Sequence, residues 1–205
     1  ANTGKGLLGP PNPNSHNTSD PQPKTNGPLL DYLSDQILLL DGAMGTSIHS
    51  RHLDLKEDFL GKENCMEILN RTRPEVIRDI HISFLTAGAD GLKTNTFGAS
   101  PLTLGEFEIA SEAHDLCLRG AELAREAIQE FAGDGRSRFV FGSIGPGTRL
   151  PSLGHIDYQS LEDALTIQCR GLLKGEIDVF LIETCQDPLQ IKAAVNAAKI
   201  AMAEQ

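Results

Sequence analysis

The sequence predicts an α/β fold in which parallel strands alternate with helices. Four runs of strand-forming residues, at 37–40, 91–97, 139–141 and 179–182, are each followed by a stretch with helical periodicity. Because a helix separates each strand from the next, the strands must be parallel and joined by right-handed crossovers. The pattern fits either a doubly wound sheet or part of an eight-stranded barrel. The Rossmann fingerprint is missing after the first run, which weighs against dinucleotide binding.

Size and composition restrict the class of protein further. With 205 residues and 40% apolar content, the chain can hold one domain with a substantial core. A net charge of −10 and the absence of Trp argue against nucleic-acid and anionic-membrane partners. No stretch matches a membrane span or a signal peptide. The cysteines lack the spacing of a disulfide framework or zinc ribbon, so we expect reduced thiols in a cytoplasmic protein: Cys65, Cys117, Cys169 and Cys185.

The first residues differ from the rest of the chain. Residues 1–28 are rich in Pro, Asn, Gly and Ser, and they carry too little apolar surface to offset the entropy of ordering. We therefore expect a disordered tail at 1–28 and a folded region at 29–205, opening with a short helix or turn. The chain starts at Ala1 without Met and stops at Gln205 inside a predicted helix, so we expect both ends to be cut edges.

The first predicted strand, 37–40, is four apolar residues long and runs directly into Asp41 and a glycine-rich turn. Such an uninterrupted apolar run suits a strand buried on both faces. Gly42 lacks a Cβ, so backbone N–H groups of this turn can approach a ligand closely. His49 and His52 follow with i,i+3 spacing. They could present two metal ligands on a helix, but two solvated loop histidines are the simpler interpretation.

The helix between the first two strands has recognisable ends. Thr72 and Glu75 fit a capping box, and Pro74 suits the first turn because its missing N–H costs little there. Gly88 is suited to end this helix.

Three further helices follow. The next spans about 111–131, with an apolar stripe and a charged outer face. Another spans 160–175 with Ser160 as a fair N-cap. The last begins at Asp187 and Pro188, a cap followed by a proline at the first helical position.

Polar side chains stand where each predicted strand ends. They are Asp41 after the first strand, Asn95 near the end of the second, Ser143 after the third and Glu183 after the fourth. Because functional residues of parallel α/β folds sit at the carboxyl ends of strands, we expect these four to point into one pocket. The glycine-rich segment around Ser143 lacks the Walker spacing, so it is either a pocket wall or a plain turn.

Two carboxylates at one pocket allow several chemistries. Asp41 and Glu183 could bind a substrate ammonium, hold a hard metal ion, or act as the acid/base pair of a glycoside hydrolase. They could also simply cap the loops that follow them. The residues by themselves leave these alternatives open.

Four segments together resemble a known family. Residues 41–46 read DGAMGT, 94–98 read TNTFG, 142–146 read GSIGP and 182–187 read IETCQD. In this order and at these spacings they are similar to the homocysteine-binding module of the zinc homocysteine S-methyltransferases, and within them of the cobalamin-dependent methionine synthases. The resemblance covers about 29–205, and no single motif would be specific.

The resemblance implies a TIM barrel of which this chain holds the first half, four βα units with parallel strands. It implies that Asp41 and Glu183 hold the amino group of homocysteine, while backbone N–H groups near Gly42 and Ala43 help with its carboxylate. Asn95 and Ser143 are expected at the same substrate site.

The resemblance also implies what this chain lacks. The family binds zinc through cysteines that follow its sixth and eighth strands, beyond Gln205, so we expect no zinc ligand and no catalytic residue here. Cys185 follows Glu183 but matches no family ligand. Zinc activates the homocysteine thiol in the complete domain, and cobalamin and methyltetrahydrofolate are implied in other domains. We expect the fragment to be inactive and, with open strand edges, marginally stable or aggregating.

Three alternatives remain at this stage. One is a betaine- or S-methylmethionine-dependent homocysteine methyltransferase, which differs in the methyl donor. Another is a TIM-barrel hydrolase that uses Asp41 and Glu183 as an acid/base pair. The third is a non-catalytic remnant that binds a partner through its open edge strands.

Overall fold

The computed structural model describes residues 28–205. The predicted disordered tail lies outside the described residues, except for Pro28, with which the first helix begins. The helices are α1 (Pro28–Asp35), α2 (Met44–His49), α3 (Leu69–Thr72), α4 (Pro74–Thr86), α5 (Pro101–Gly105), α6 (Ala113–Glu130), α7 (Tyr158–Lys174) and α8 (Pro188–Ala203). The strands are β1 (Gly91–Lys93), β2 (Phe139–Ile144) and β3 (Val179–Ile182), and short 3-10 turns lie at Met66–Ile68, Ala110–Glu112, Ala132–Asp134 and Pro151–Leu153.

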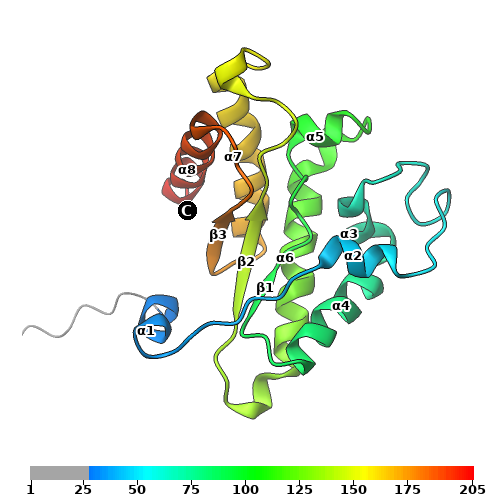
Figure 1. Cartoon of the computed structure of the whole chain (residues 1–205), viewed down its shortest axis with the longest axis vertical. Helices are drawn as coiled ribbons and strands as arrows, with labels where there is room; N and C mark the ends of the chain where they lie inside the picture. Colours follow the sequence, from blue (N-terminus) through cyan, green and yellow to red (C-terminus); the bar gives the residue numbers. More distant parts are fainter. Residues whose placement is uncertain (1–27) are drawn as a thin grey trace, which may run out of the picture.

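The three strands form one parallel sheet in the order β1-β2-β3. Leu92 pairs with Val140, and Ser143 pairs with Leu181. Helices α4, α6, α7 and α8 pack each on the next beside the sheet (Figure 1). The predicted alternation of parallel strands with helices is therefore confirmed. Among residues 28–205, the structure has no helix with the length and apolarity needed to cross a bilayer.

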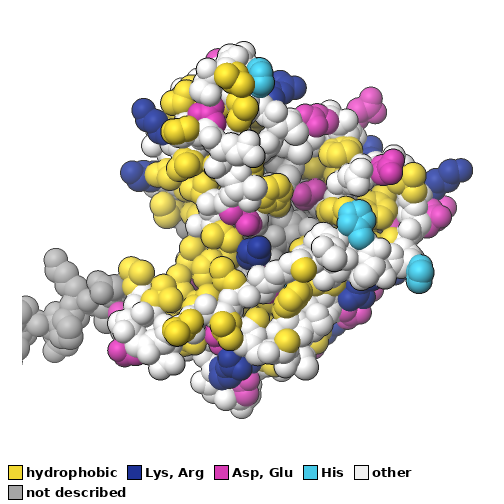
Figure 2. All heavy atoms as spheres, in the orientation of Figure 1, with side chains coloured by type: hydrophobic (Ala, Val, Ile, Leu, Met, Phe, Trp, Pro, Cys, Tyr) yellow, Lys and Arg dark blue, Asp and Glu magenta, His cyan; other side chains and the backbone are white. Residues whose placement is uncertain are grey.

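The first predicted strand is wrong as an element. Residues 37–40 make only one isolated parallel bridge, between Leu40 and Gly91. Ile37 is 86% exposed and Leu39 is 56% exposed, so the expected burial on both faces is also wrong. Hydrophobic side chains gather on this face of the molecule between α1 and α8 (Figure 2). An apolar run becomes a buried strand only where other elements cover both faces, and here its side chains stay in contact with solvent.

Two aspartates that directly precede strands attach the neighbouring chain segment in the same way. The N–H of Asp90 donates to the carbonyl of Leu39, whose own N–H donates to Asp90 Oδ2 at 3.1 Å. The N–H of Asp178 likewise donates to the carbonyl of Val140, whose N–H donates to Asp178 Oδ2 at 2.6 Å. Each carboxylate thus supplies the acceptor that a longer strand would have supplied through its backbone.

The helix starts show which local predictions hold. Asp187 caps α8 with a complete capping box, and Pro188 follows at the first turn, as predicted. The predicted capping box at α4 is wrong, because Arg73 is the N-cap and has no side-chain cap. The hydroxyl of Thr72 donates instead to the carbonyl of Asp58.

The start of α7 differs from the prediction, whereas the end of α4 agrees with it. Helix α7 begins at Asp157, which accepts from the N–H of Ser160, so Ser160 is not the N-cap. Gly88 follows the end of α4 with φ at 104°, a conformation that glycine adopts readily.

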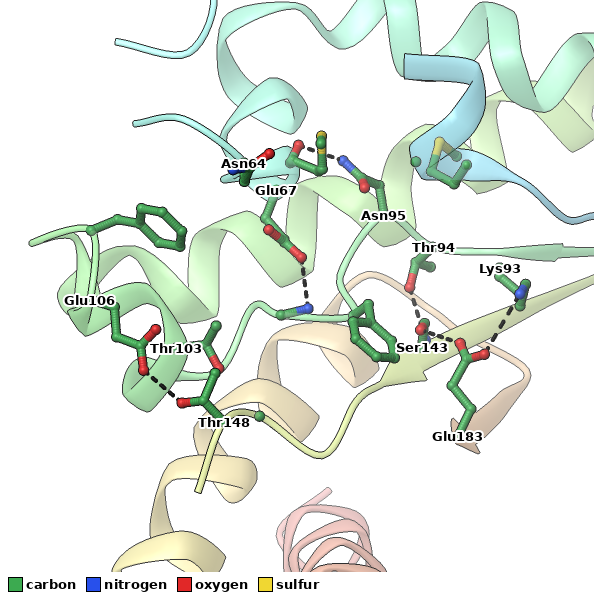
Figure 3. A pocket seen from close by; sticks show the side chains of 17 residues that line it. Asn64, Glu67, Lys93, Thr94, Asn95, Thr103, Glu106, Ser143, Thr148 and Glu183 are labelled. Atoms are coloured by element: carbon green, nitrogen blue, oxygen red, sulfur yellow. Dashed lines mark hydrogen bonds and ion pairs between the residues drawn. The ribbon is translucent and has the colours of Figure 1, made fainter. Parts of the chain in front are cut away.

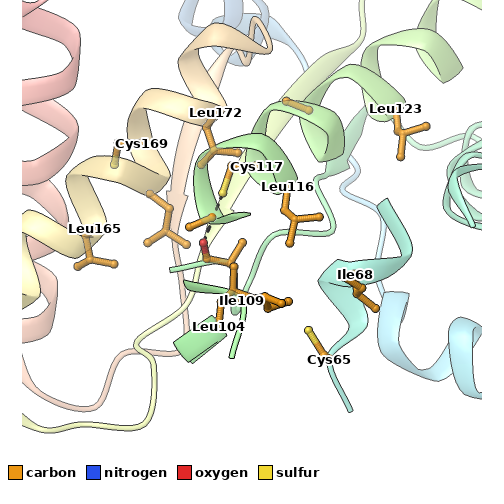
Figure 4. Close-up of a cluster of buried hydrophobic side chains, with 14 of the residues drawn as sticks. Cys65, Ile68, Leu104, Ile109, Leu116, Cys117, Leu123, Leu165, Cys169 and Leu172 are labelled. Atoms are coloured by element: carbon orange, nitrogen blue, oxygen red, sulfur yellow. Dashed lines mark hydrogen bonds between the residues drawn. The ribbon is translucent and has the colours of Figure 1, made fainter. Parts of the chain in front are cut away.

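The core lies between the helices and the sheet. Figure 4 shows the side chains of α6 and α7 meeting there, with Cys117 of α6 next to Leu172 of α7, whereas Leu116 points toward the segment that carries Ile68. A Cβ at Gly171 would come within 2.3 Å of the carbonyl oxygen of His114, so only glycine allows the two helices to cross this closely. The close packing of α6 and α7 therefore shields this side of the core from solvent.

All four cysteines are free thiols in this fold. Burial raises the pKa of Cys65 to about 11 and that of Cys169 to about 12, because a thiolate would lose its hydration there. Cys117 is also fully buried and its pKa is raised, whereas Cys185 is partly exposed.

Candidate functional site

A cavity of about 550 Å³ opens where the strands end. Lys93 is the last residue of β1, Ser143 lies near the end of β2, and Glu183 follows β3 (Figure 3). The carboxyl ends of parallel strands meet at one edge, which explains why residues so distant in sequence come together. The other side chains that line the cavity come from the start of α2 and from the segments that follow α2, β1 and β2: Met44, Asn64, Met66, Glu67, Thr94, Asn95, Phe97, Thr103, Glu106, Phe107 and Thr148.

Glu183 is held between a hydroxyl and an ammonium. The hydroxyl of Ser143 donates to Glu183 Oε1 at 2.6 Å, and Lys93 Nζ lies 3.6 Å from Glu183 Oε2. The side chains of Glu183 and Lys93 are 25% and 29% exposed, so both charged groups remain accessible from the cavity. The structure thus brings two of the predicted site residues together and adds Lys93 to them.

Asp41 lies next to this group but not in the cavity wall. Its side chain is 2% exposed, and Oδ1 accepts from the N–H of Lys93 at 3.0 Å. Oδ2 lies 3.8 Å from Nδ1 of His81, a buried imidazole whose two nitrogens have no hydrogen-bond partner. Gly42 and Ala43 are also absent from the cavity lining, whereas Met44 and Gly45 belong to it. Asp41 is therefore connected to Glu183 only through Lys93.

Asn95 lines the cavity but uses its amide to hold the wall together. Its Nδ2 group donates to the carbonyl of Met66 at 2.8 Å and to Oδ1 of Asn70 at 3.0 Å. Asn70 in turn donates to the backbone carbonyls of Asn95 and Leu116. Both amide hydrogens of Asn95 are thus engaged, and the residue fixes the turn before α3 against the end of β1.

Hydroxyl groups and one glycine fix the shape of the cavity floor. Thr94 accepts from the N–H of Ser143, while the hydroxyl of Thr96 donates to the carbonyl of Ser143. A Cβ at Gly145 would lie 2.7 Å from the carbonyl oxygen of Phe97, to which the Gly145 N–H donates. Gly145 is therefore required for this close approach of two loops.

Carboxylates outnumber cations around the cavity. Glu67 is buried and accepts from the N–H of Gly98 at 2.7 Å, and its burial raises the pKa of the carboxyl group. Glu106 accepts from the hydroxyl of Thr148 at 2.6 Å. Of the described residues that line the cavity, Lys93 is the only Lys or Arg.

No metal centre emerges from the described chain. Within residues 28–205, no three His, Cys, Asp or Glu side chains lie close enough together to hold a metal ion. His49 ends α2 and His52 follows it, and both are exposed. Cys185 makes a contact of 3.6 Å from Sγ to the carbonyl oxygen of Glu183.

Sequence reasoning missed Lys93, although a signal was present. Lys93 directly precedes the polar segment 94–98, at the end of a strand whose other residues are apolar. A charged residue at that position has to face either solvent or a functional pocket. Its partner Glu183 is distant in the sequence, so the pairing itself required the fold.

Comparisons with known proteins agree with the arrangement of strands and motifs. The profile of the family described as homocysteine S-methyltransferase matches residues 38–204. The chain is 48% identical over 174 residues to a methionine synthase of Mycobacterium tuberculosis and 46% identical over 176 residues to one of Mycobacterium leprae. These matches cover 85% and 86% of this chain, which spans 14% of the length of either relative.

Solved structures with a similar fold include the homocysteine methyltransferase MmuM from Escherichia coli. Its oxidized form has a TM-score of 0.69 at 24% identity, covering 85% of this chain and 62% of that chain. Its metallated form has a TM-score of 0.69 at 23% identity and covers 85% of this chain and 63% of that one. At this level of identity the likeness establishes the fold.

Proposed function

This chain belongs to the homocysteine S-methyltransferase family, and we propose that residues 29–205 are the homocysteine-binding part of a methionine synthase. In the proposed reaction of the complete protein, a methyl group passes from methylcobalamin to zinc-activated homocysteine to give methionine. 5-Methyltetrahydrofolate would regenerate the methylcobalamin in other domains. The identity of nearly half to two mycobacterial methionine synthases favours this branch over methyltransferases that use betaine or S-methylmethionine.

The observation that carries this proposal is the environment of Glu183. Its carboxylate faces a cavity large enough for a small amino acid, and Ser143 holds one of its oxygens by a hydrogen bond of 2.6 Å. A carboxylate that is oriented by a neutral hydroxyl keeps its negative charge available to a substrate cation. We therefore assign Glu183 to the ammonium group of homocysteine and Ser143 to the orientation of Glu183.

The other predicted site residues receive more indirect roles. Asp41 holds the N–H of Lys93, so its effect on the substrate passes through the end of β1. A direct contact between Asp41, or the N–H groups of Gly42 and Ala43, and the substrate would require the turn before α2 to shift. Asn95 is proposed to shape the wall through its contacts to the turn at Met66.

We further propose that the described elements are the first half of a (β/α)8 barrel. Parallel strands separated by helices and the bridge from Leu40 to Gly91 at the edge of β1 are consistent with this architecture. The described residues do not fit a zinc site, since no suitable donor cluster exists among them. Activation of the thiol is therefore assigned to none of them, and we expect residues 28–205 alone to lack methyl transfer.

Steady-state kinetics of the full-length protein test the role of Glu183. The Glu183→Gln substitution should raise the KM for homocysteine about 10- to 100-fold, because a hydrogen bond to a charged group contributes roughly 1.5–3 kcal/mol. Zinc content should stay at the wild-type level. Glu126→Gln, on the outer face of α6, is the matched control and should change neither quantity. An unchanged KM, or loss of zinc from the Glu183 variant, would contradict the assignment.

A further inference from the structure

We propose that Lys93 binds the α-carboxylate of the substrate, so that the cavity selects an α-amino acid over a simple amine. The inference rests on the proposed function, because it takes Glu183 as the partner of the substrate ammonium. It assigns the carboxylate of the substrate to Lys93, a residue that lies outside the four sequence motifs.

The charges around the cavity carry the first step. Glu67, Glu106 and Glu183 line it together with Lys93, the only Lys or Arg among the described lining residues. The carboxylates of Glu106 and Glu183 would repel the carboxylate of an incoming amino acid and would favour a purely cationic ligand. A substrate that carries both charges therefore needs the ammonium of Lys93 to offset this repulsion.

The separation of the two charged groups carries the second step. Lys93 Nζ and Glu183 Oε2 are 3.6 Å apart, and in Figure 3 the two side chains point toward one another. In an α-amino acid, standard bond lengths place the ammonium nitrogen roughly 3 Å from the nearer carboxylate oxygen. The zwitterion can thus lie alongside the pair with each of its charges next to the opposite charge. The 3.6 Å separation also exceeds that of a direct charged hydrogen bond, so docking breaks no such bond.

The backbone of Lys93 is fixed on both sides, which makes it a suitable anchor. Lys93 pairs with Phe141 in the sheet, and its N–H donates to Asp41 Oδ1 at 3.0 Å. A long flexible side chain binds more specifically when its point of attachment does not move. This also gives Asp41 a positioning role, since it holds the strand end from which the ammonium projects.

The alternative carboxylate site suggested by the sequence is less well placed. Gly42 and Ala43 are not among the cavity-lining residues, and the helix that follows them, α2, is only six residues long. Lys93 is therefore the better-placed donor for a substrate carboxylate in the described structure.

Binding measurements on the full-length protein separate the two halves of the head group. L-Homocysteine and its decarboxylated analogue 3-aminopropane-1-thiol are titrated calorimetrically into the wild type and variants. Lys93→Met should weaken homocysteine binding about 10- to 100-fold without weakening binding of the amine. Lys93→Arg should retain homocysteine binding, and Lys199→Met, on the exposed face of α8, is the matched control. Lys93→Gln provides a second neutral variant if the Met variant does not fold.

Each outcome decides between the proposals. Equal weakening of both ligands, or unchanged or tighter homocysteine binding in the neutral variants Lys93→Met and Lys93→Gln, would overturn the role of Lys93. Tighter binding would show that Lys93 instead competes with the substrate for Glu183. If Glu183→Gln leaves the binding of both ligands unchanged, the proposed function itself fails. If Glu183→Gln weakens both and Lys93→Met changes neither, only the inference about Lys93 fails.

Discussion

The centre of the sheet and the apolar run at its edge have similar compositions but different surroundings. All six residues of β2 are buried, and Ile144 at its end is 1% exposed. In the run at 37–40, Ile37 is 86% exposed and only Leu40 forms a bridge. Strand β2 has a neighbour on each side, whereas the run at 37–40 meets only the start of β1. The difference shows that neighbouring elements, and not apolar composition, determine which segment is buried.

The largest expected effect comes from truncating isoleucine at the two positions. Ile144→Ala should lower the free energy of unfolding by about 2–5 kcal/mol, since it removes buried contacts and leaves a cavity. Ile37→Ala changes the same chemical group in a solvent-exposed place and should stay within about 0.5 kcal/mol. Urea unfolding followed by circular dichroism measures both. Comparable losses in the two variants would mean that Ile37 is packed against another part of the protein.

A smaller effect should distinguish Asp178 from Asp90, which attach their neighbours by the same pair of hydrogen bonds. Asp178→Ala leaves the N–H of fully buried Val140 without an acceptor, which costs about 1–3 kcal/mol. Asp90→Ala removes the acceptor of the N–H of Leu39. Because the residue Leu39 is 56% exposed, water can replace this acceptor, and the loss of stability should be below about 1 kcal/mol.

The two aspartates make a matched pair because each also bonds to one arginine. Asp178 bonds to Arg125 and Asp90 bonds to Arg136, so both alanine variants lose an ion pair as well as a backbone acceptor. Thermal unfolding of both variants under one buffer condition gives the comparison. A greater loss for Asp90→Ala would reverse the order and show that the edge run is held more firmly than its exposure indicates.

The same contrast explains which features could be predicted from the sequence. The start of α8 at Asp187 and Pro188 depends on residues that are adjacent in the chain, so local chemistry was sufficient. The extent of the first strand depends on what covers residues 37–40, which no local pattern records. The N-cap of α4 is Arg73, one residue after the predicted Thr72, and that of α7 is Asp157, three residues before the predicted Ser160. Shifts of this size are common at helix ends.

In the candidate site, too, some features could be predicted from the sequence and others depended on contacts between distant segments. Ser143 and Glu183 line the cavity as expected, because strand ends converge in any parallel sheet. The place of Asp41 beside the N–H of Lys93 follows from the pairing of the edge run with β1, which periodicity did not resolve. The contact between Lys93 and Glu183 joins residues from different strands, so it could be seen only once β1 and β3 were in register with β2.

The smallest effect is a change in how stability depends on pH, and it contrasts a buried acid with a capping acid. Burial raises the pKa of Glu67 in the folded state above its ordinary value of 4.5, so folding is most favoured below that pH. Stability is then lost as the pH rises through the folded-state pKa. Glu67→Gln keeps an acceptor for the N–H of Gly98 and should remove this loss, raising the melting temperature relative to the wild type as the pH increases from 4.5 to 7.

Asp187 should respond with the opposite sign. Hydrogen bonds from the N–H groups of Ser152 and Leu189 lower the pKa of Asp187 below its ordinary value of 3.8. Its contribution is therefore present above pH 3.8 and is lost as the pH falls through the folded-state pKa. The melting temperature of Asp187→Asn should lie below that of the wild type at pH 7, and the gap should narrow under acid conditions. If the difference in melting temperature from the wild type varied with pH in the same direction for both variants, burial would not oppose the ionisation of Glu67. The cavity wall next to Gly98 would then be more accessible to water than the structure indicates.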